Sequence, residues 1–377
     1  MLDAQTHLFV AGLGYVGERL AVRAASELGW RVSGSCRTAD KAALIRRRSG
    51  IDAYPFDLDD EYVGLNRDGL DALSSATHVL ATVPPIADFN RDPLLALHRP
   101  VLLRAGTLRW AGYLSTTSVY GDHAGAWVDE ASPCNVADGS SAADRLRAEA
   151  EWLALHDASD GRLATRVFRL AGIYGPGRSA LNTLSRRGAA VAPASPQLDN
   201  GTGAIERSHS LSGVAAGAVA RTAGNSGAAV PRYVSRIHAD CFPHRMLIAT
   251  DCGLIAPLIR YVSRIHVTDI CSALLASMAA AADGARDTAP AVYNVADNEP
   301  APRADVMAYA ASLLVASASD ASAATDGSAD SARAQRRALE NKRVSNGRML
   351  AELLPAGLAY PTYREGLRQI ALDEVDG

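Results

Sequence analysis

Three glycines near the start of the chain, Gly12, Gly14 and Gly17, form a G-x-G-x-x-G motif together with Tyr15 and Val16. The first glycine permits a tight turn, the second lets the backbone approach a phosphate, and the third lets a helix pack closely on a strand. A helix that begins here points its free N–H groups at a bound pyrophosphate. The motif therefore predicts a dinucleotide-binding loop built from these five residues.

The sequence on either side of the motif supplies the elements that such a loop needs. Residues 7–11 are apolar apart from a histidine and predict a strand, whereas the pattern of residues 18–22 predicts a helix. A glycine-rich turn that binds no nucleotide is the alternative interpretation. The strand before the motif and the helix after it favour the dinucleotide loop.

Two further predicted strands supply residues for the adenosine half of the dinucleotide. Residues 31–35 predict a strand, and Arg37 follows it, twenty residues after Gly17. An acidic residue here would bind the ribose 2′-hydroxyl of NAD, whereas an arginine accommodates the 2′-phosphate of NADP. We therefore predict NADP, with NAD as the second choice; a solvated arginine at a strand end is the alternative. Asp57 ends the third predicted strand and is placed to contact the adenine.

The middle of the cofactor is expected beside a fourth predicted strand, residues 78–82. This strand ends at Thr82, and Pro84 lies in the loop beyond it. Both residues are included in the predicted cofactor site, together with Thr116 after the next predicted strand.

Strand and helix patterns alternate from residue 7 to about residue 187. This alternation predicts an α/β protein with a Rossmann-type, doubly wound parallel sheet and helices on both of its faces. Further strands are expected at 112–115, 164–170 and 291–295, and helices at 143–158 and 267–282.

The chain divides into four predicted parts. Residues 1–187 form the NAD(P)-binding domain, whereas residues 188–258 lack helical and strand periodicity and are expected to be a poorly ordered insertion. Residues 259–300 complete the core with a helix and a strand. Residues 301–377 form a small C-terminal α/β lobe, in which the alanine- and serine-rich segment 316–333 is expected to be flexible.

One heptapeptide of the predicted insertion occurs twice. The residues of Arg232–His238 are identical to those of Arg260–His266. Structural repeats keep their pattern over a whole period and normally occur at least three times. An isolated duplicate indicates that one copy is native, and we assign the second copy to the core because it leads into a helical pattern.

Composition argues against several classes of partner. The 377 residues carry a formal net charge of −3, which offers no basic surface for nucleic acid. No stretch approaches the ~20 apolar residues of a membrane span, and polar residues precede the first strand, unlike in a signal peptide. The five cysteines are scattered without a C-x-x-C pair, as expected of reduced thiols. We therefore expect a cytoplasmic protein that binds neither nucleic acid nor membranes.

A metal site is not expected. Cys241, His244 and Cys252 could in principle hold zinc, but a fourth ligand at a normal spacing is missing.

Several longer segments resemble the short-chain dehydrogenase/reductase superfamily, and within it the atypical, NAD(P)-dependent epimerase/dehydratase-like branch of its extended members. The resemblance covers most of the chain outside the two biased segments. Besides the glycine motif, it is carried by Gly112–Asp122, Val128–Glu130, Phe168–Arg178, Arg264–Asp269, Asn341–Asn346 and Tyr360–Leu367.

The resemblance implies a catalytic Ser/Thr and a Tyr-x-x-x-Lys pair, whose tyrosine is the acid/base. Thr116 matches the Ser/Thr, but with Glu149 as the helix anchor Ser141 stands at the tyrosine position and Arg145 at the lysine position. No Tyr-x-x-x-Lys occurs anywhere in the chain. A serine hydroxyl is far too weak an acid for this role. Arginine can still bind ribose hydroxyls, but it does not titrate usefully.

A substitute acid/base would have to come from Tyr120, Asp122, His123 or Tyr174, of which Tyr120 is included in the predicted catalytic set. For each of these residues, the competing interpretation is a side chain that only lines the wall of the site or is solvated, without an acid/base role. Asp269 is expected to stabilise the start of the helix at 267–282. Arg178 is expected either to contact an anion or to form a surface ion pair.

These observations leave two classes of function. The first is an NAD(P)-binding oxidoreductase, epimerase or dehydratase that acts on a small polar, sugar-derived substrate and carries a degenerate Tyr-x-x-x-Lys site. The second is a non-catalytic sensor or scaffold that responds to NADP(H), and the missing tyrosine and lysine favour it. Substrate choice lies in loops without a readable code. The sequence neither requires nor excludes assembly into a homodimer.

Overall fold

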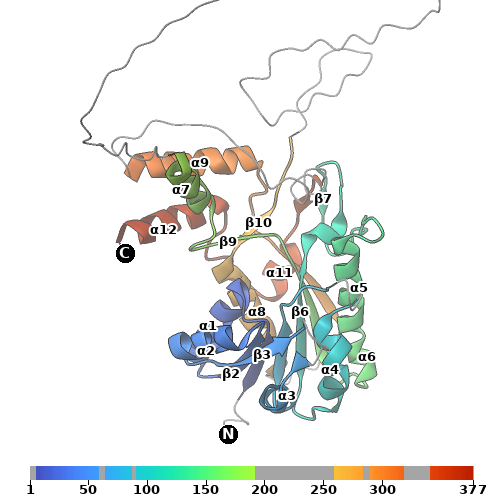
Figure 1. The fold of residues 1–377 in the computed structure, drawn as a ribbon. Helices are drawn as coiled ribbons and strands as arrows, with labels where there is room; N and C mark the ends of the chain where they lie inside the picture. Colours follow the sequence, from blue (N-terminus) through green and yellow to red (C-terminus); the bar gives the residue numbers. More distant parts are fainter. Residues whose placement is uncertain are drawn as a thin grey trace, which may run out of the picture. The chain divides into compact units, whose positions relative to one another are not determined.

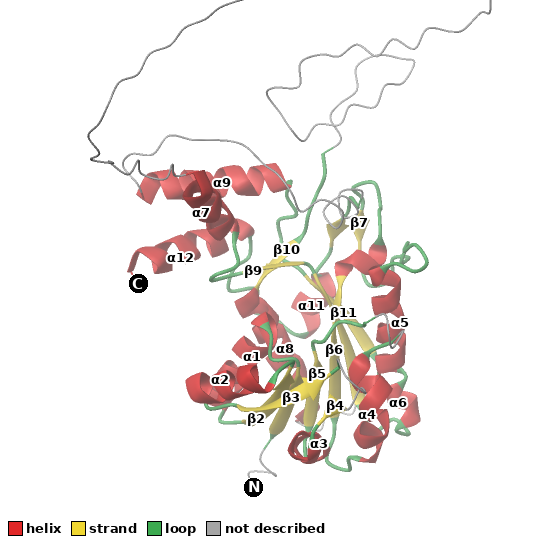
Figure 2. Cartoon of the chain, in the orientation of Figure 1, coloured by secondary structure: helices red, strands yellow, loops and turns green. Residues whose placement is uncertain are grey.

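A twisted, mostly parallel sheet forms the centre of the computed structural model (Figures 1 and 2). The structure describes residues 6–58, 64–86, 91–191, 259–282, 289–317 and 340–376. All of these except 189–191 belong to one unit, Met1–Gly188 with Leu258–Gly377. The predicted insertion at 188–258 and the predicted flexible segment at 316–333 lie almost wholly outside the described residues.

Eight strands make up the sheet, in the order β11-β8-β6-β5-β1-β2-β3-β4. Each pairs in parallel with its neighbours, except that β4 is antiparallel to β3. Their bounds are β1 (His7–Ala11), β2 (Arg31–Cys36), β3 (Asp52–Asp57), β4 (Gly64–Leu65), β5 (His78–Ala81), β6 (Trp110–Thr116), β8 (Ala164–Leu170) and β11 (Ala291–Val295).

Helices cover both faces of this sheet (Figure 2). One face packs against α1 (Tyr15–Leu28), α2 (Ala39–Ser49), α8 (Val267–Ala282) and α11 (Gly347–Glu352). The other packs against α3 (Arg67–Ser74), α4 (Pro93–Arg104), α5 (Ser141–Leu153) and α6 (Leu155–Ala158). Because both faces are covered, the central strands are mostly apolar, and every residue of β1 is buried. The predicted doubly wound α/β fold is confirmed.

The strands that sequence periodicity predicted lie within a few residues of their expected bounds, and α8 matches its prediction. Besides β4, four short strands were not predicted. They form two parallel pairs, β9 (Gly172–Tyr174) with β10 (Arg264–His266) and β7 (Trp127–Val128) with β12 (Arg343–Val344). Two or three residues are too few to show an alternating pattern.

A smaller helical core lies beside the carboxyl ends of the strands. Three helices build it, α7 (Ala180–Val191), α9 (Arg303–Ser317) and α12 (Tyr363–Asp376), around Leu181, Val306, Tyr363 and Leu367. The chain between α9 and α12 returns to the main body, where α11 packs its Met349 into the core of the sheet. The C-terminal segment is therefore shared between the helical core and the main domain.

Candidate functional site

Two glycines in the loop between β1 and α1 stand where a side chain does not fit. Gly12 has a φ of +104°, a conformation that favours glycine, and a Cβ atom there would lie 2.4 Å from Thr82 Oγ1. A Cβ atom on Gly17 would lie 2.4 Å from the Gly12 carbonyl oxygen. Gly12 therefore makes the turn out of β1, and Gly17 lets α1 pack against that turn.

Gly14 differs from these two because it faces open space. It is the N-cap residue of α1 and supplies no side-chain cap, and a Cβ atom there would meet nothing within 4 Å. The first turn of α1 thus presents its N–H groups to an open cradle, which is the arrangement that a pyrophosphate needs. The residues present fit a dinucleotide.

The other members of the motif support the loop. Val16 is buried in the core, whereas the Tyr15 hydroxyl donates a hydrogen bond to the Pro176 carbonyl oxygen at 3.1 Å. Thr82 also acts on the loop, because its hydroxyl donates to the Gly12 carbonyl oxygen at 2.6 Å. Thr82 thereby ties the carboxyl end of β5 to the turn, and Pro84, two residues further on, is exposed.

The predicted adenosine contacts lie at the same edge of the sheet. Arg37 follows β2 and Asp57 ends β3, and both side chains are exposed. Because β1, β2 and β3 are parallel neighbours, their carboxyl ends meet at the edge that also carries the glycine loop. Ligands of doubly wound sheets bind outside this edge.

Thr116 occupies the carboxyl end of β6, two strands from β1. Its hydroxyl accepts a hydrogen bond from the Ser118 N–H at 3.2 Å and donates one to Ser118 Oγ at 3.3 Å. Thr116 thus caps the short 3-10 helix Thr117–Tyr120.

Helix α5 brings the two altered catalytic positions toward this strand end. Ser141 is the first residue of α5 and is exposed. One turn later, the Arg145 guanidinium donates to the Leu114 carbonyl oxygen at 3.2 Å, two residues before Thr116. Arg145 is therefore held beside the carboxyl end of β6, the strand that ends at Thr116, and Ser141 begins the same helix. The catalytic roles of these three residues stay a prediction.

A buried ion pair holds α5 on the sheet. Arg169 of β8 and Glu149 of α5 are 8% and 3% exposed, and their closest nitrogen and oxygen are 2.7 Å apart. The Ser115 hydroxyl of β6 also donates to Glu149. Glu149, which set the alignment of this helix with the Tyr-x-x-x-Lys pattern, is thus also the residue that holds α5 on the sheet.

Tyr120 belongs to this buried network. Its side chain is fully buried, and its hydroxyl donates to Asn294 Oδ1 at 2.7 Å and accepts from the Arg169 guanidinium at 2.9 Å. Burial raises the pKa of Tyr120 to about 12. The hydroxyl therefore both donates and accepts a hydrogen bond within the protein. This geometry favours a residue that lines the wall of the site over one that acts as an acid/base.

The other substitutes have local partners as well. Asp122 accepts hydrogen bonds from the Asn341 and Ala124 N–H groups. The His123 ring lies against the Tyr120 and Pro133 carbonyl oxygens at 3.0 and 3.2 Å. Both side chains therefore stabilise the loop that follows Tyr120.

One acidic and one basic side chain, those of Asp269 and Lys342, make contacts that the sequence did not indicate. Asp269 binds the N–H groups of Ala359 and Tyr360 at 2.7 and 3.1 Å, so it holds the loop before α12 as well as lying in the first turn of α8. Lys342 is buried, and its ammonium group donates to the Gly121 carbonyl oxygen at 2.8 Å. No local sequence signal marks this contact, which joins residues far apart in the chain.

Arg178 lies over the glycine loop. Its guanidinium stands 5.4 Å from the centre of the Tyr15 ring, within cation–π range. The anion contact and the surface ion pair expected as alternatives for Arg178 both stay predictions.

Within the described part of the chain, no group of three or more His, Cys, Asp or Glu side chains could hold a metal ion. Cys241, His244 and Cys252 lie outside it. Among the described helices, none is long and apolar enough to cross a membrane.

Neither a protein-family model nor a curated protein matches the chain, but solved structures match it over nearly its whole length. A functionally unknown conserved protein from Silicibacter pomeroyi is 30% identical, with a TM-score of 0.61 and coverage of 98% of this chain and 99% of the other. A protein from Methylobacillus flagellatus, named as an NAD-dependent epimerase/dehydratase, is 20% identical, with a TM-score of 0.59 and coverage of 99% and 100%. The dTDP-glucose 4,6-dehydratase from Bacillus anthracis, in complex with NAD, is 14% identical, with a TM-score of 0.57 and coverage of 99% and 97%.

The chain therefore has the fold of these solved epimerase and dehydratase structures, the fold that the sequence motifs implied. It belongs to the same family as the conserved protein from Silicibacter pomeroyi.

Proposed function

We propose that this protein binds NADP(H) across the carboxyl ends of β1, β2, β5 and β6. The observation that carries the proposal is the contrast within the glycine loop: Gly12 and Gly17 have no room for a side chain, whereas Gly14 opens on a cradle at the start of α1. Tyr15 and Val16 fix the first turn of that helix, and Thr82 fixes the turn before it. Solved structures of the same fold include a dehydratase with bound NAD.

The choice of NADP over NAD rests on Arg37. An exposed guanidinium at the carboxyl end of β2 can form a charge-assisted hydrogen bond with a 2′-phosphate. Asp57, on the next strand, would lie near the adenine. Isothermal titration with NADPH and NADH tests this choice, since equal affinities for the two would refute it.

For the chemistry, we propose an atypical site in which binding groups are kept and the usual proton relay is replaced. A bound nicotinamide would accept or supply hydride. Thr116 would orient the oxygen of a small polar, sugar-derived substrate, and Arg145 would bind ribose hydroxyls as a cation that does not titrate. Ser141 keeps its proton at neutral pH and serves at most as a hydrogen-bond donor and acceptor.

The second candidate is a non-catalytic protein that responds to NADP(H). It is favoured by the hydrogen bonds of Tyr120, Asp122 and His123, each of which has partners other than Thr116. A screen of carbonyl and sugar-nucleotide substrates with saturating cofactor separates the two candidates. Cofactor binding without turnover supports the second, and turnover that depends on Thr116 supports the first.

A further inference from the structure

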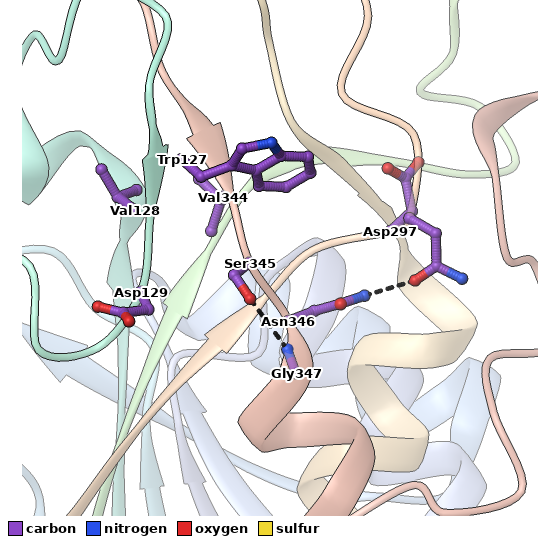
Figure 3. Close-up of a pocket in the computed structure, with 9 residues that line it drawn as sticks. Trp127, Val128, Asp129, Asp297, Val344, Ser345, Asn346 and Gly347 are labelled. Carbon is purple, nitrogen blue, oxygen red and sulfur yellow. Dashed lines mark hydrogen bonds between the residues drawn. The ribbon is translucent and has the colours of Figure 1, made fainter.

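A cavity of about 530 Å³ lies at the carboxyl ends of β7 and β12, beside the loop that follows β11 (Figure 3). This volume is in the range of small-molecule sites. None of its lining residues belongs to the proposed cofactor or catalytic set. Its aromatic and polar lining comes from Trp127, Asp129, Asp297, Asn298, Ser345 and Asn346.

Trp127 provides an aromatic surface at one side of this cavity, and Asp297 lies at the other (Figure 3). The Trp127 side chain is 54% exposed, although tryptophan is among the largest apolar side chains. The Arg343 guanidinium stands 5.2 Å from the centre of its ring. An indole held in this way and left open to the cavity can stack against a flat apolar face.

Asp297 provides a buried polar group in the cavity wall. It is 1% exposed, and one of its carboxyl oxygens accepts the Glu299 N–H at 3.2 Å. Among the described residues, the other oxygen has no hydrogen-bond partner. Burial raises the pKa of Asp297 to about 8, so at neutral pH the carboxyl holds its proton and can both donate and accept. An unpartnered buried carboxyl is costly, and a ligand hydroxyl would relieve that cost.

Two asparagine amides lie between these groups. Asn346 Nδ2 donates to Asn298 Oδ1 and to the Ala296 carbonyl oxygen, both at 2.8 Å. This pairing fixes both amide planes, and no hydrogen bond to a described residue uses Asn298 Nδ2 or Asn346 Oδ1. The cavity therefore offers both a donor and an acceptor in fixed positions.

The charges around the cavity disfavour ionic ligands. No described residue that lines it is a lysine or an arginine, and the Ser132 hydroxyl lowers the pKa of the exposed Asp129, which is therefore an anion. Phosphates and carboxylates would be repelled. A cationic ligand on the indole would lie close to the Arg343 guanidinium, which stands 5.2 Å from the centre of that ring.

We propose that this cavity binds a neutral, hydroxyl-rich ring, a pyranose or a cyclitol. Its apolar C–H face lies on Trp127, and its hydroxyl groups bind Asp297, Asn298 and Asn346. The site is separate from the proposed cofactor function and does not depend on it.

The test uses the full-length protein and calorimetry with D-glucose, D-galactose and myo-inositol, with glucose 6-phosphate and glucosamine as charged counterparts. At least one neutral compound is expected to bind with a Kd of about 1 mM or tighter. Trp127→Ala should weaken that binding at least tenfold, and Asn298→Ala at least fivefold. Trp127→Phe, which keeps an aromatic face, should stay within about threefold.

Each variant is also titrated with NADPH and melted thermally, and both results should match the unchanged protein, since Trp127 and Asn298 are exposed. Three results would overturn the proposal. In the first, no neutral compound binds at ten times the expected Kd. In the second, Trp127→Ala binds the neutral compound as tightly as the unchanged protein does. In the third, either charged compound binds more tightly than its neutral parent.

Discussion

Arg169 and Glu149 form an ion pair that is buried between β8 and α5, with 2.7 Å between nitrogen and oxygen. Their partners extend the pair to Ser115 on β6 and, through Tyr120, to Asn294 on β11. Five elements are therefore joined through one charged contact, namely β8, α5, β6, the 3-10 helix that carries Tyr120, and β11. Removing one member of such a pair leaves the other buried and uncompensated.

Glu149→Gln is expected to lower the free energy of unfolding by about 3–5 kcal/mol, because it leaves Arg169 without its counter-charge. The control is Glu27→Gln, which breaks an exposed pair of similar length with Arg23, 2.8 Å apart, and should cost at most about 1 kcal/mol. Urea unfolding measures both. Similar small losses in the two variants would contradict the role given to the buried pair.

The glycine loop predicts opposite behaviour for two alanine substitutions. Gly17→Ala places a methyl group against the Gly12 carbonyl and should destabilise the fold by about 1–3 kcal/mol. Gly14→Ala should change stability by less than about 0.5 kcal/mol, yet it should weaken NADPH binding at least tenfold because its methyl group enters the cradle. Thermal melting and calorimetry distinguish the two effects. If Gly14→Ala binds NADPH normally, the pyrophosphate lies elsewhere.

Arg37→Ala should weaken the binding free energy of NADPH by about 1.5–3 kcal/mol, the contribution of a hydrogen bond to a charged group. It should leave the affinity for NADH unchanged. Arg47→Ala, at an exposed position near the end of α2, is the matched control and should alter neither. An equal loss for both cofactors in Arg37→Ala would argue against recognition of the 2′-phosphate.

Turnover of alcohols and sugar nucleotides is expected to fall below the ordinary range of about 1–1,000 per second, because Ser141 and Arg145 replace the usual pair. The double variant Ser141→Tyr with Arg145→Lys restores Tyr-x-x-x-Lys and should raise any turnover, followed as NADPH absorbance. The idea fails if the unchanged protein turns over in the ordinary range and Thr116→Ala abolishes that activity.

The stability of the protein should fall from pH 6.5 to pH 8 in a manner that depends on Asp297. Its folded pKa of about 8 lies above the ordinary value of 3.8, so the folded state binds the proton more tightly and loses stability as the pH rises through this interval. The loss amounts to at most about 2 kcal/mol, from 1.36 kcal/mol per pH unit. Asp297→Asn should flatten the profile in thermal melts. His266, whose folded pKa is lowered to about 4, contributes an opposite slope, but only below pH 6.5.

The main sheet was predictable because its strands are buried on both faces and appear as apolar runs, such as residues 7–11. The glycine motif also predicted the turn after β1, because the residues that form this turn are close together in the sequence. The pairs β9 with β10 and β7 with β12 were not predictable, because their partners come from distant parts of the chain. Likewise, the contacts of Lys342 with Gly121 and of Asp269 with the loop at Ala359 depend on tertiary packing that no local pattern records.

The docking of α5 through Glu149 has a consequence for how this site can change. The helix is held to the sheet one turn beyond Arg145 and two turns beyond Ser141, by residues that would not touch a reacting group. A substitution at the exposed position 141 therefore carries little penalty in folding, and one at position 145 removes a hydrogen bond to Leu114 but keeps the buried ion pair. The chemistry can thus drift while the scaffold stays intact. The same separation makes the two positions a tolerant starting point for installing a new proton donor by directed evolution.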